Sequence, residues 1–174
     1  MADGLPNVHS KERIGTVQQV YDGALLPDVQ ANTFRNIDRL FSTRTIHKGK
    51  TVYPLPKSDV QLKNFSFASN GKNYDLYDYV SINRVSGLLV IKNGKIAFED
   101  YELGNSDQTR WMSMSVVKSI TATLVGIAIQ DGFIKSIDDP VTRYLPELKG
   151  SAYDGVSVRN LLQMASGVQW NETY

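Results

Sequence analysis

The sequence predicts a mixed α/β fold of the α+β kind, with an antiparallel sheet flanked by helices. Two observations predict it. Two apolar runs, 86–92 and 95–101, are separated by Asn93-Gly94, and a long apolar segment spans 115–130. Strand-forming runs joined by an Asn-Gly pair are typical of a β-hairpin, because this pair tolerates the positive φ angles of a tight turn. An apolar run longer than about 12 residues is instead typical of a helix.

The helices follow from periodicity and from their end signals. Segment 115–130 is apolar on nearly every face, which indicates a buried helix. Gly132 ends it, since a glycine commonly follows the last helical turn. A second helix is expected over 157–164, with Ser157 as its N-cap.

The two halves of the chain differ in regularity. Residues 1–84 are poorly periodic, and we expect them to form an N-terminal extension that wraps around the core. Residues 85–174 carry the strand and helix patterns. A length of 174 residues suits one domain or part of a larger one.

Composition excludes several classes of protein. The chain has 19 lysines and arginines and 18 aspartates and glutamates. It therefore has no excess of basic residues for binding nucleic acid through bulk charge. A hydrophobic content of 41% argues against disorder. There is no cysteine, and two histidines are too few for a multi-histidine metal site and argue against a Ser-His-Asp triad.

The chain has no apolar stretch of the roughly 18 to 20 residues that would span a bilayer. No signal peptide is visible at its start. Because the first residues resemble an already processed end, we expect a periplasmic or secreted protein, with the cytoplasm as the alternative.

Ser115 and Lys118 form an S-x-x-K motif at the start of the long helix. One helical turn places the lysine amine beside the serine hydroxyl. A lysine in a desolvated cleft loses affinity for its proton, and it can then activate the hydroxyl as a nucleophile. The alternative is an ordinary N-cap serine with a lysine that extends to water. A second match, Ser69 to Lys72, lies in an expected turn and has no fixed register.

Four features in the same order carry a resemblance to a known family. They are the hairpin 87–101, the motif from Ser115 to Lys118, the turn 137–141 and the segment 161–168. Residues 86–174 thereby resemble the serine β-lactamase and penicillin-binding-protein superfamily, especially its class C-like esterase and amidohydrolase branch.

Three further segments, 111–115, 146–155 and 171–174, bring the sequence closest to one amide hydrolase of that branch. The fold that the resemblance implies is the N-terminal part of a β-lactamase/transpeptidase-like fold, with a sheet domain and a helical domain.

The resemblance implies an acyl-enzyme mechanism on a small ester or amide, with Ser115 as nucleophile and Lys118 as general base. No metal or organic cofactor is implied. The family's third catalytic group is a tyrosine in a Y-x-N motif further downstream, which these residues do not include. We therefore expect a companion polypeptide carrying the C-terminal half of the fold.

Tyr174 and Glu172 match positions that line the substrate pocket in the resembling amide hydrolase; the alternative is a terminal loop without a role. Trp170 is expected to pack at a helix end, with pocket lining as its alternative. Asp138 and Asp139 are expected to cap and order a turn rather than to catalyse.

Three functions stay open on the sequence. The leading one is an amide or ester hydrolase. The second is a penicillin-binding enzyme, either a D,D-peptidase or a β-lactamase. The third is a non-catalytic binding fragment that keeps the fold without the chemistry.

Overall fold

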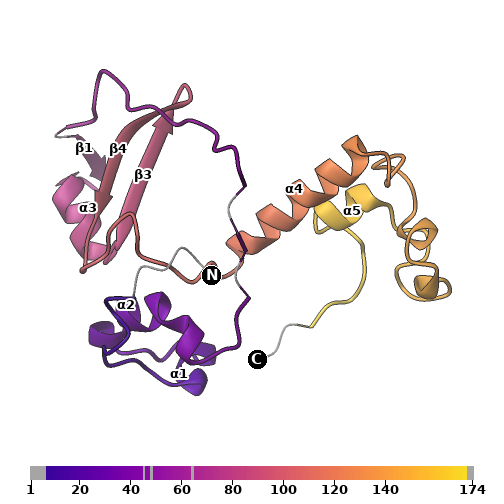
Figure 1. Ribbon diagram of the computed structural model, residues 1–174, viewed down its shortest axis with the longest axis horizontal. Coiled ribbons are helices and arrows are strands. Elements are labelled where there is room, and N and C mark those ends of the chain that lie inside the picture. Colours follow the sequence, from indigo (N-terminus) through magenta and orange to yellow (C-terminus); the bar gives the residue numbers. More distant parts are fainter. Residues whose placement is uncertain (1–6, 45, 48, 64, 172–174) are drawn as a thin grey trace. The chain divides into compact units, whose positions relative to one another are not determined.

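A computed structural model describes residues 7–44, 46–47, 49–63 and 65–171 (Figure 1). It divides the chain into two compact units, Met1–Met112 and Ser113–Tyr174, which we call the first and second unit. Helices and antiparallel strands are mixed, as the sequence predicts. The expected extension 1–84 lies within the first unit, and its boundary at residue 84 stays a prediction.

The first unit begins with short helices. These are α1 (Val17–Tyr21), α2 (Pro27–Arg35) and the 3-10 turn η1 (Ile37–Arg39). Helix α1 starts at a capping box, in which Thr16 accepts from the Gln19 amide and the Gln19 side chain accepts from the Thr16 amide. Helix α2 has proline at its first turn, where a missing N–H costs nothing.

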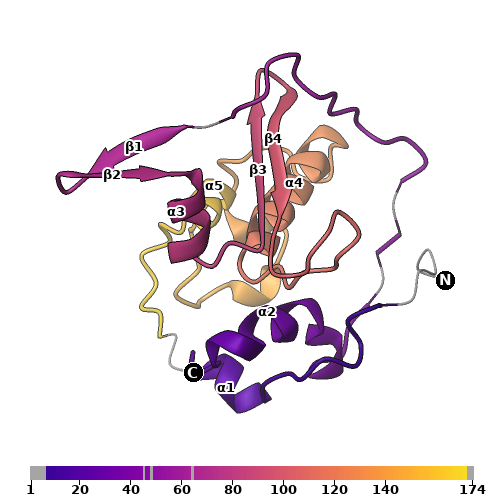
Figure 2. The ribbon, with the colours of Figure 1, turned by 90° about the vertical axis from the view of Figure 1, so that its left-hand side faces the viewer.

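Two antiparallel hairpins follow in the first unit (Figure 2). The smaller pairs β1 (Ser66–Ser69) with β2 (Lys72–Asp75), and helix α3 (Leu76–Ile82) leaves β2 through a capping box. The larger pairs β3 (Gly87–Lys92) with β4 (Lys95–Tyr101).

The β3–β4 hairpin confirms the prediction made from Asn93-Gly94. Both residues have positive φ angles, 53° and 72°, as a type I′ turn requires. Beyond β4, the amide of Ile96 donates to the Pro56 carbonyl and the amide of Leu62 donates to the Ala97 carbonyl. Among the described residues, the far edge of β3 pairs with no further strand.

A partly buried ion pair links separate segments of the first unit. The Arg35 side chain is 5% exposed, and it donates two hydrogen bonds to the Glu12 carboxylate at 2.7 and 2.8 Å. It also donates to the Asn32 side chain, the Leu103 carbonyl and the Asn105 side chain. A buried charge is tolerated only when it is paired and hydrogen-bonded. This network therefore ties the N-terminal helices to the loop that follows β4.

The second unit contains α4 (Val116–Gln130), two 3-10 turns η2 (Val141–Arg143) and η3 (Pro146–Leu148), and α5 (Val158–Leu162). Helix α5 begins at Ser157, whose hydroxyl accepts from the Asn160 amide, as predicted.

The prediction of a buried long helix is wrong for this structure. No residue of α4 is buried, and Leu124 and Val116 are 58% and 68% exposed. The apolar pattern predicts that the side chains of α4 are stable only when other residues cover them. The described part of the second unit has too few residues against α4 to cover these side chains. Of the helices in the described ranges, none combines the length and apolarity that a membrane crossing requires.

The hairpin turn gives a first testable prediction. Gly94→Ala places a side chain at φ 72°, a left-handed conformation that costs about 1 kcal/mol. The matched control is Gly126→Ala inside α4, where a methyl group meets open space and helix propensity gains up to about 1 kcal/mol. Urea unfolding should show opposite signs for the two changes. Equal effects would contradict the turn assignment.

The buried ion pair gives a second prediction. Burial raises the pKa of Glu12, but hydrogen bonds from Arg35 and His9 outweigh burial and hold that pKa below its ordinary value. The pair therefore stabilises the fold above the ordinary pKa of about 4.3, and the stabilisation is lost as pH falls through the lower folded pKa.

We expect Glu12→Gln to lower the free energy of unfolding by about 2 kcal/mol at pH 7. The difference should shrink as the pH falls through the lowered pKa of Glu12, because the wild-type carboxylate is then protonated too. Unfolding free energies at several pH values check this. A difference that is constant with pH would contradict it.

Candidate active site

Ser115 and Lys118 lie together at the start of α4. Lys118 Nζ donates a hydrogen bond to Ser115 Oγ over 3.0 Å. Ser115 is in the helical region, with φ −72° and ψ −4°, so the helix brings the two side chains together from a spacing of three residues. The contact is local, and it needs no other element of the chain.

The Ser115 hydroxyl does not cap its helix. The residue occupies the N-cap position of α4, but its side chain makes no capping hydrogen bond. Ser157 differs, because its hydroxyl accepts from the Asn160 amide at the start of α5. The N-cap alternative therefore describes Ser157, while the Ser115 hydroxyl is engaged by the lysine.

Ser115 and Lys118 are both exposed to solvent. The expected desolvated cleft is thus not formed by the described residues. As an ammonium ion Lys118 donates to the hydroxyl, whereas a base must be uncharged and accept the hydroxyl proton. The distance between Lys118 Nζ and Ser115 Oγ suits a hydrogen bond in which either group is the donor. Burial of the amine would favour its uncharged form.

The backbone amides at the start of α4 are largely occupied. Those of Val116, Val117 and Lys118 donate to the carbonyls of residues 113, 114 and 115, at 3.0 to 3.4 Å. These three amides are therefore not free donors for a negatively charged oxygen of a substrate.

The remaining predicted site residues are Trp170, Glu172 and Tyr174. Glu172 and Tyr174 lie outside the described residues. Trp170 is 71% exposed, so it is not the packing residue that the sequence suggested.

Asp138 and Asp139 order a turn, as expected. Arg159 donates two hydrogen bonds to the Asp138 carboxylate, at 2.6 and 3.2 Å, and thereby lowers its pKa. Asp139 accepts from the Tyr144 hydroxyl, which lowers its pKa in turn, and from Arg143 at 3.1 Å. Both carboxylates are committed to structural partners, and exposed pairs of this kind contribute little to stability.

The second S-x-x-K match has no comparable geometry. Ser69 and Lys72 are opposite each other across the β1–β2 hairpin, and Asn70 and Gly71 form the turn between them. The motif there is a consequence of a tight turn, which agrees with the sequence interpretation.

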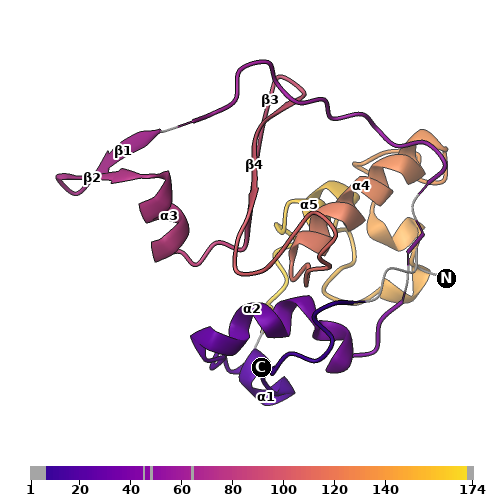
Figure 3. The ribbon, with the colours of Figure 1, turned by 60° about the vertical axis from the view of Figure 1, so that its left-hand side comes forward.

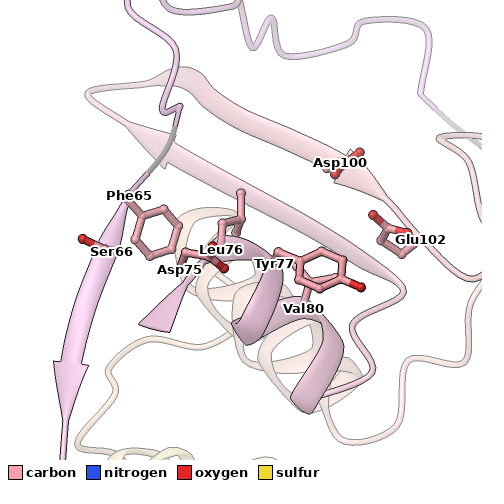
Figure 4. Close-up of a pocket in the computed structure, with 8 residues that line it drawn as sticks. All are labelled: Phe65, Ser66, Asp75, Leu76, Tyr77, Val80, Asp100 and Glu102. Atoms are coloured by element: carbon pink, nitrogen blue, oxygen red, sulfur yellow. The ribbon is translucent and has the colours of Figure 1, made fainter. Parts of the chain in front are cut away.

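A hollow of about 480 Å³ lies in the first unit and is lined by residues around α3 and β4 (Figure 4). Its carboxylates are Asp75, Asp100 and Glu102. Two of these already have partners, because Asp75 accepts from the Asp78 amide and Asp100 from the Tyr101 amide. The lining does not include Ser115 or Lys118.

Comparisons with known proteins show which family this chain resembles. A family model described as Beta-lactamase matches residues 83–174. A 6-aminohexanoate-dimer hydrolase of Paenarthrobacter ureafaciens is 38% identical over 100 residues, which are 58% of this chain and 25% of that protein. A beta-lactamase of Pseudomonas fluorescens is 38% identical over 85 residues, 45% of this chain and 24% of the relative.

A third relative, a beta-lactamase of Providencia stuartii, is 41% identical over 83 residues, 44% of this chain and 21% of that protein. One solved structure, from Bacillus anthracis and assigned by name to the 6-aminohexanoate-dimer hydrolases, matches with a TM-score of 0.55 and 19% identity. The match covers 65% of this chain and 29% of that one, and it supports the fold.

These matches confirm the family and the amide-hydrolase resemblance that the sequence predicts. The chain spans about a quarter of the length of the curated relatives it matches.

The two serines give a matched prediction. Ser157→Ala removes a capping hydrogen bond and should lower the free energy of unfolding by about 1 kcal/mol. Ser115→Ala removes no cap and should change it by less than about 0.5 kcal/mol. Denaturant unfolding of both variants checks this. A larger loss for Ser115→Ala would assign that hydroxyl to folding.

Proposed function

The chain belongs to the beta-lactamase family, and from that premise we propose that it supplies the nucleophile of a serine hydrolase. The reaction is cleavage of an amide or ester bond through an acyl-serine intermediate. The observation that carries the proposal is the 3.0 Å contact between Lys118 Nζ and Ser115 Oγ. A serine hydrolase mechanism is general for this family.

The proposed steps use the two side chains in turn. Uncharged Lys118 takes the proton of Ser115 Oγ, and the oxygen adds to the substrate carbonyl carbon. The carbon–nitrogen or carbon–oxygen bond then breaks, and the proton passes to the leaving amine or alcohol. Water hydrolyses the acyl-serine, which releases a carboxylic acid and restores the Ser115 hydroxyl.

A small amide is the substrate class that we favour. One relative is named a 6-aminohexanoate-dimer hydrolase, and its aligned region is the longest among the three relatives above. We propose that Tyr174, Glu172 and Trp170 line the substrate pocket, with the Glu172 carboxylate favouring a substrate that carries an amine.

Penicillin-directed chemistry is the second candidate, because two relatives are named beta-lactamases. The two candidates differ in their covalent chemistry. A penicillin-binding enzyme would carry a fluorescent penicillin on Ser115, whereas an esterase or amidase would hydrolyse p-nitrophenyl acetate and ignore penicillin.

We further propose that activity requires a companion polypeptide carrying the C-terminal half of the fold. Two features of the separate units support this: the far edge of β3 lacks a strand partner among the described residues, and the apolar side chains of α4 are exposed. Covering α4 would also desolvate Lys118, which favours its uncharged form. Intact mass of the purified protein tests this, since a single species of 19.4 kDa with full activity would refute it.

The direct test is labelling with a fluorophosphonate, applied to the protein at its natural length. We expect peptide mapping to place the label on Ser115, with Ser113→Ala as the neighbouring control that keeps it. Lys118→Arg retains a positive charge but stays protonated. If Lys118 is the base, the labelling rate falls by about 10² or more.

Two results would overturn the proposal. Labelling that persists in Ser115→Ala would exclude Ser115 as the nucleophile. An undiminished rate in Lys118→Arg would exclude Lys118 as the base. A protein that binds substrate without labelling or turnover would be the non-catalytic fragment.

A further inference from the structure

We propose that a hollow of the first unit, beside the last turn of α2, binds a small organic carboxylate that carries an apolar group. The inference goes beyond the proposed function, because it uses neither Ser115 nor Lys118. The hollow has a volume of about 330 Å³, at the lower end of the range for small-molecule sites. Figure 3 shows the loop that leaves β4 passing beside α2, within the same unit.

Apolar side chains form part of the lining and are held in place. Phe34 and Ile37 come from α2 and η1, and Trp111 comes from the end of the loop. The rings of Phe34 and Trp111 meet edge to face, with centroids 5.6 Å apart and planes at 82°. The Met112 amide donates to the Phe34 carbonyl over 2.9 Å and so holds the backbone next to Trp111. The apolar part of a ligand would therefore meet a surface that is already formed, which lowers the ordering cost of binding.

The charged residues of the lining favour an anion. Arg44 and Arg110 both border the hollow, together with the carboxylate of Asp38. Arg110 Nη2 lies 3.9 Å from Asp38 Oδ2, which is too long for a hydrogen bond. Arg44 forms no hydrogen bond or ion pair with any described residue. Two arginines therefore share one carboxylate at this hollow, and Arg44 has no counter-charge among the described residues.

Arg35 also borders the hollow, but its charge is already neutralised. Its guanidinium donates two hydrogen bonds to the Glu12 carboxylate, and its side chain is 5% exposed. It therefore has little left to offer a ligand. The cationic groups available to a ligand are those of Arg44 and Arg110.

Trp111 adds a neutral donor to the same lining. Its indole N–H can only donate, and it forms no hydrogen bond within the described residues. The ring thus presents an apolar surface and one polar atom, a combination that suits a ligand with an apolar part and an acceptor oxygen.

This set of groups selects one class of ligand. A planar guanidinium matches a carboxylate through two parallel hydrogen bonds. An inorganic anion would satisfy the arginines but would leave the rings of Phe34 and Trp111 without a contact. An organic cation would be repelled by both arginines. A carboxylate attached to an apolar group uses the charged and the apolar parts of the lining together.

The experiment is an NMR titration of the isotope-labelled protein at its natural length with 4-phenylbutyrate, followed on the indole N–H signal of Trp111. Trp111→Phe keeps an aromatic ring and identifies that signal by its loss. We expect a saturable shift of the signal with a Kd of about 1 mM or lower. The neutral analogue 4-phenylbutyramide should bind about 10-fold more weakly or worse, because it lacks the charge.

Three variants test the charges separately. Arg44→Gln should weaken binding of 4-phenylbutyrate by about 10-fold or more. Asp38→Asn should strengthen it by about 2-fold or more, because the repulsion between two carboxylates is lost. Arg13→Gln is the matched control, since Arg13 is 76% exposed and lies outside the lining, and it should leave the Kd unchanged.

Several outcomes would overturn the inference. They are a Trp111 signal that does not shift, equal binding of the amide, and undiminished binding in Arg44→Gln. Displacement of the probe by an equal concentration of inorganic phosphate would also overturn it, because the apolar lining would then play no part. If Arg44→Gln fails to fold, Asp38→Asn decides, and binding that is unchanged or weaker in that variant counts against the site.

The test is independent of the proposed function. The titration needs no reaction at Ser115, so an unreactive Ser115 would overturn the proposed function and leave this site standing. A reactive Ser115 with no response at Trp111 would overturn this site alone.

Discussion

One helical turn separates Ser115 from Lys118, and the chemistry proposed for this chain depends on that turn being intact. The helix sets the 3.0 Å approach of the amine to the hydroxyl without help from distant residues. The Ser115 hydroxyl is available to Lys118 because it makes no capping hydrogen bond at the start of α4. Ser157, in the corresponding place on α5, has a hydroxyl that is already committed to a backbone amide.

The surroundings of this pair explain why the short motif is not sufficient. A lysine acts as a base only when its charged form is disfavoured, which requires burial or a nearby positive charge. Here the exposed apolar side chains of α4 and the exposed amine of Lys118 belong to the same helix. A surface that covered α4 would bury its apolar side chains and would also desolvate the Lys118 amine. We therefore connect the proposed companion polypeptide to catalysis as well as to folding.

Sequence reasoning succeeded where the signal was local. Asn93-Gly94 predicted the β3–β4 turn, Ser157 predicted a helix cap, and the S-x-x-K spacing predicted that two side chains would meet. Each depends on residues within a few positions of one another.

Sequence reasoning failed where a structural feature depends on residues that are far apart in the sequence. The guanidinium of Arg35 contacts residues 68 and 70 positions away, and no periodicity reports such a pairing. The strands β1 and β2 were missed although their turn was expected, because short exposed strands carry little apolar alternation. The prediction that α4 is buried was wrong. An apolar pattern indicates that a helix favours burial, but it does not show whether other residues are present to cover that helix.

The measurement that tests the central claim most directly is rapid-quench mass spectrometry during turnover of p-nitrophenyl acetate by the protein at its natural length. The account predicts a transient gain of one acetyl group on the peptide that contains Ser115, and its location on that residue by fragmentation. Steady hydrolysis with no acetyl group on Ser115, or with the group on another residue, would contradict the account.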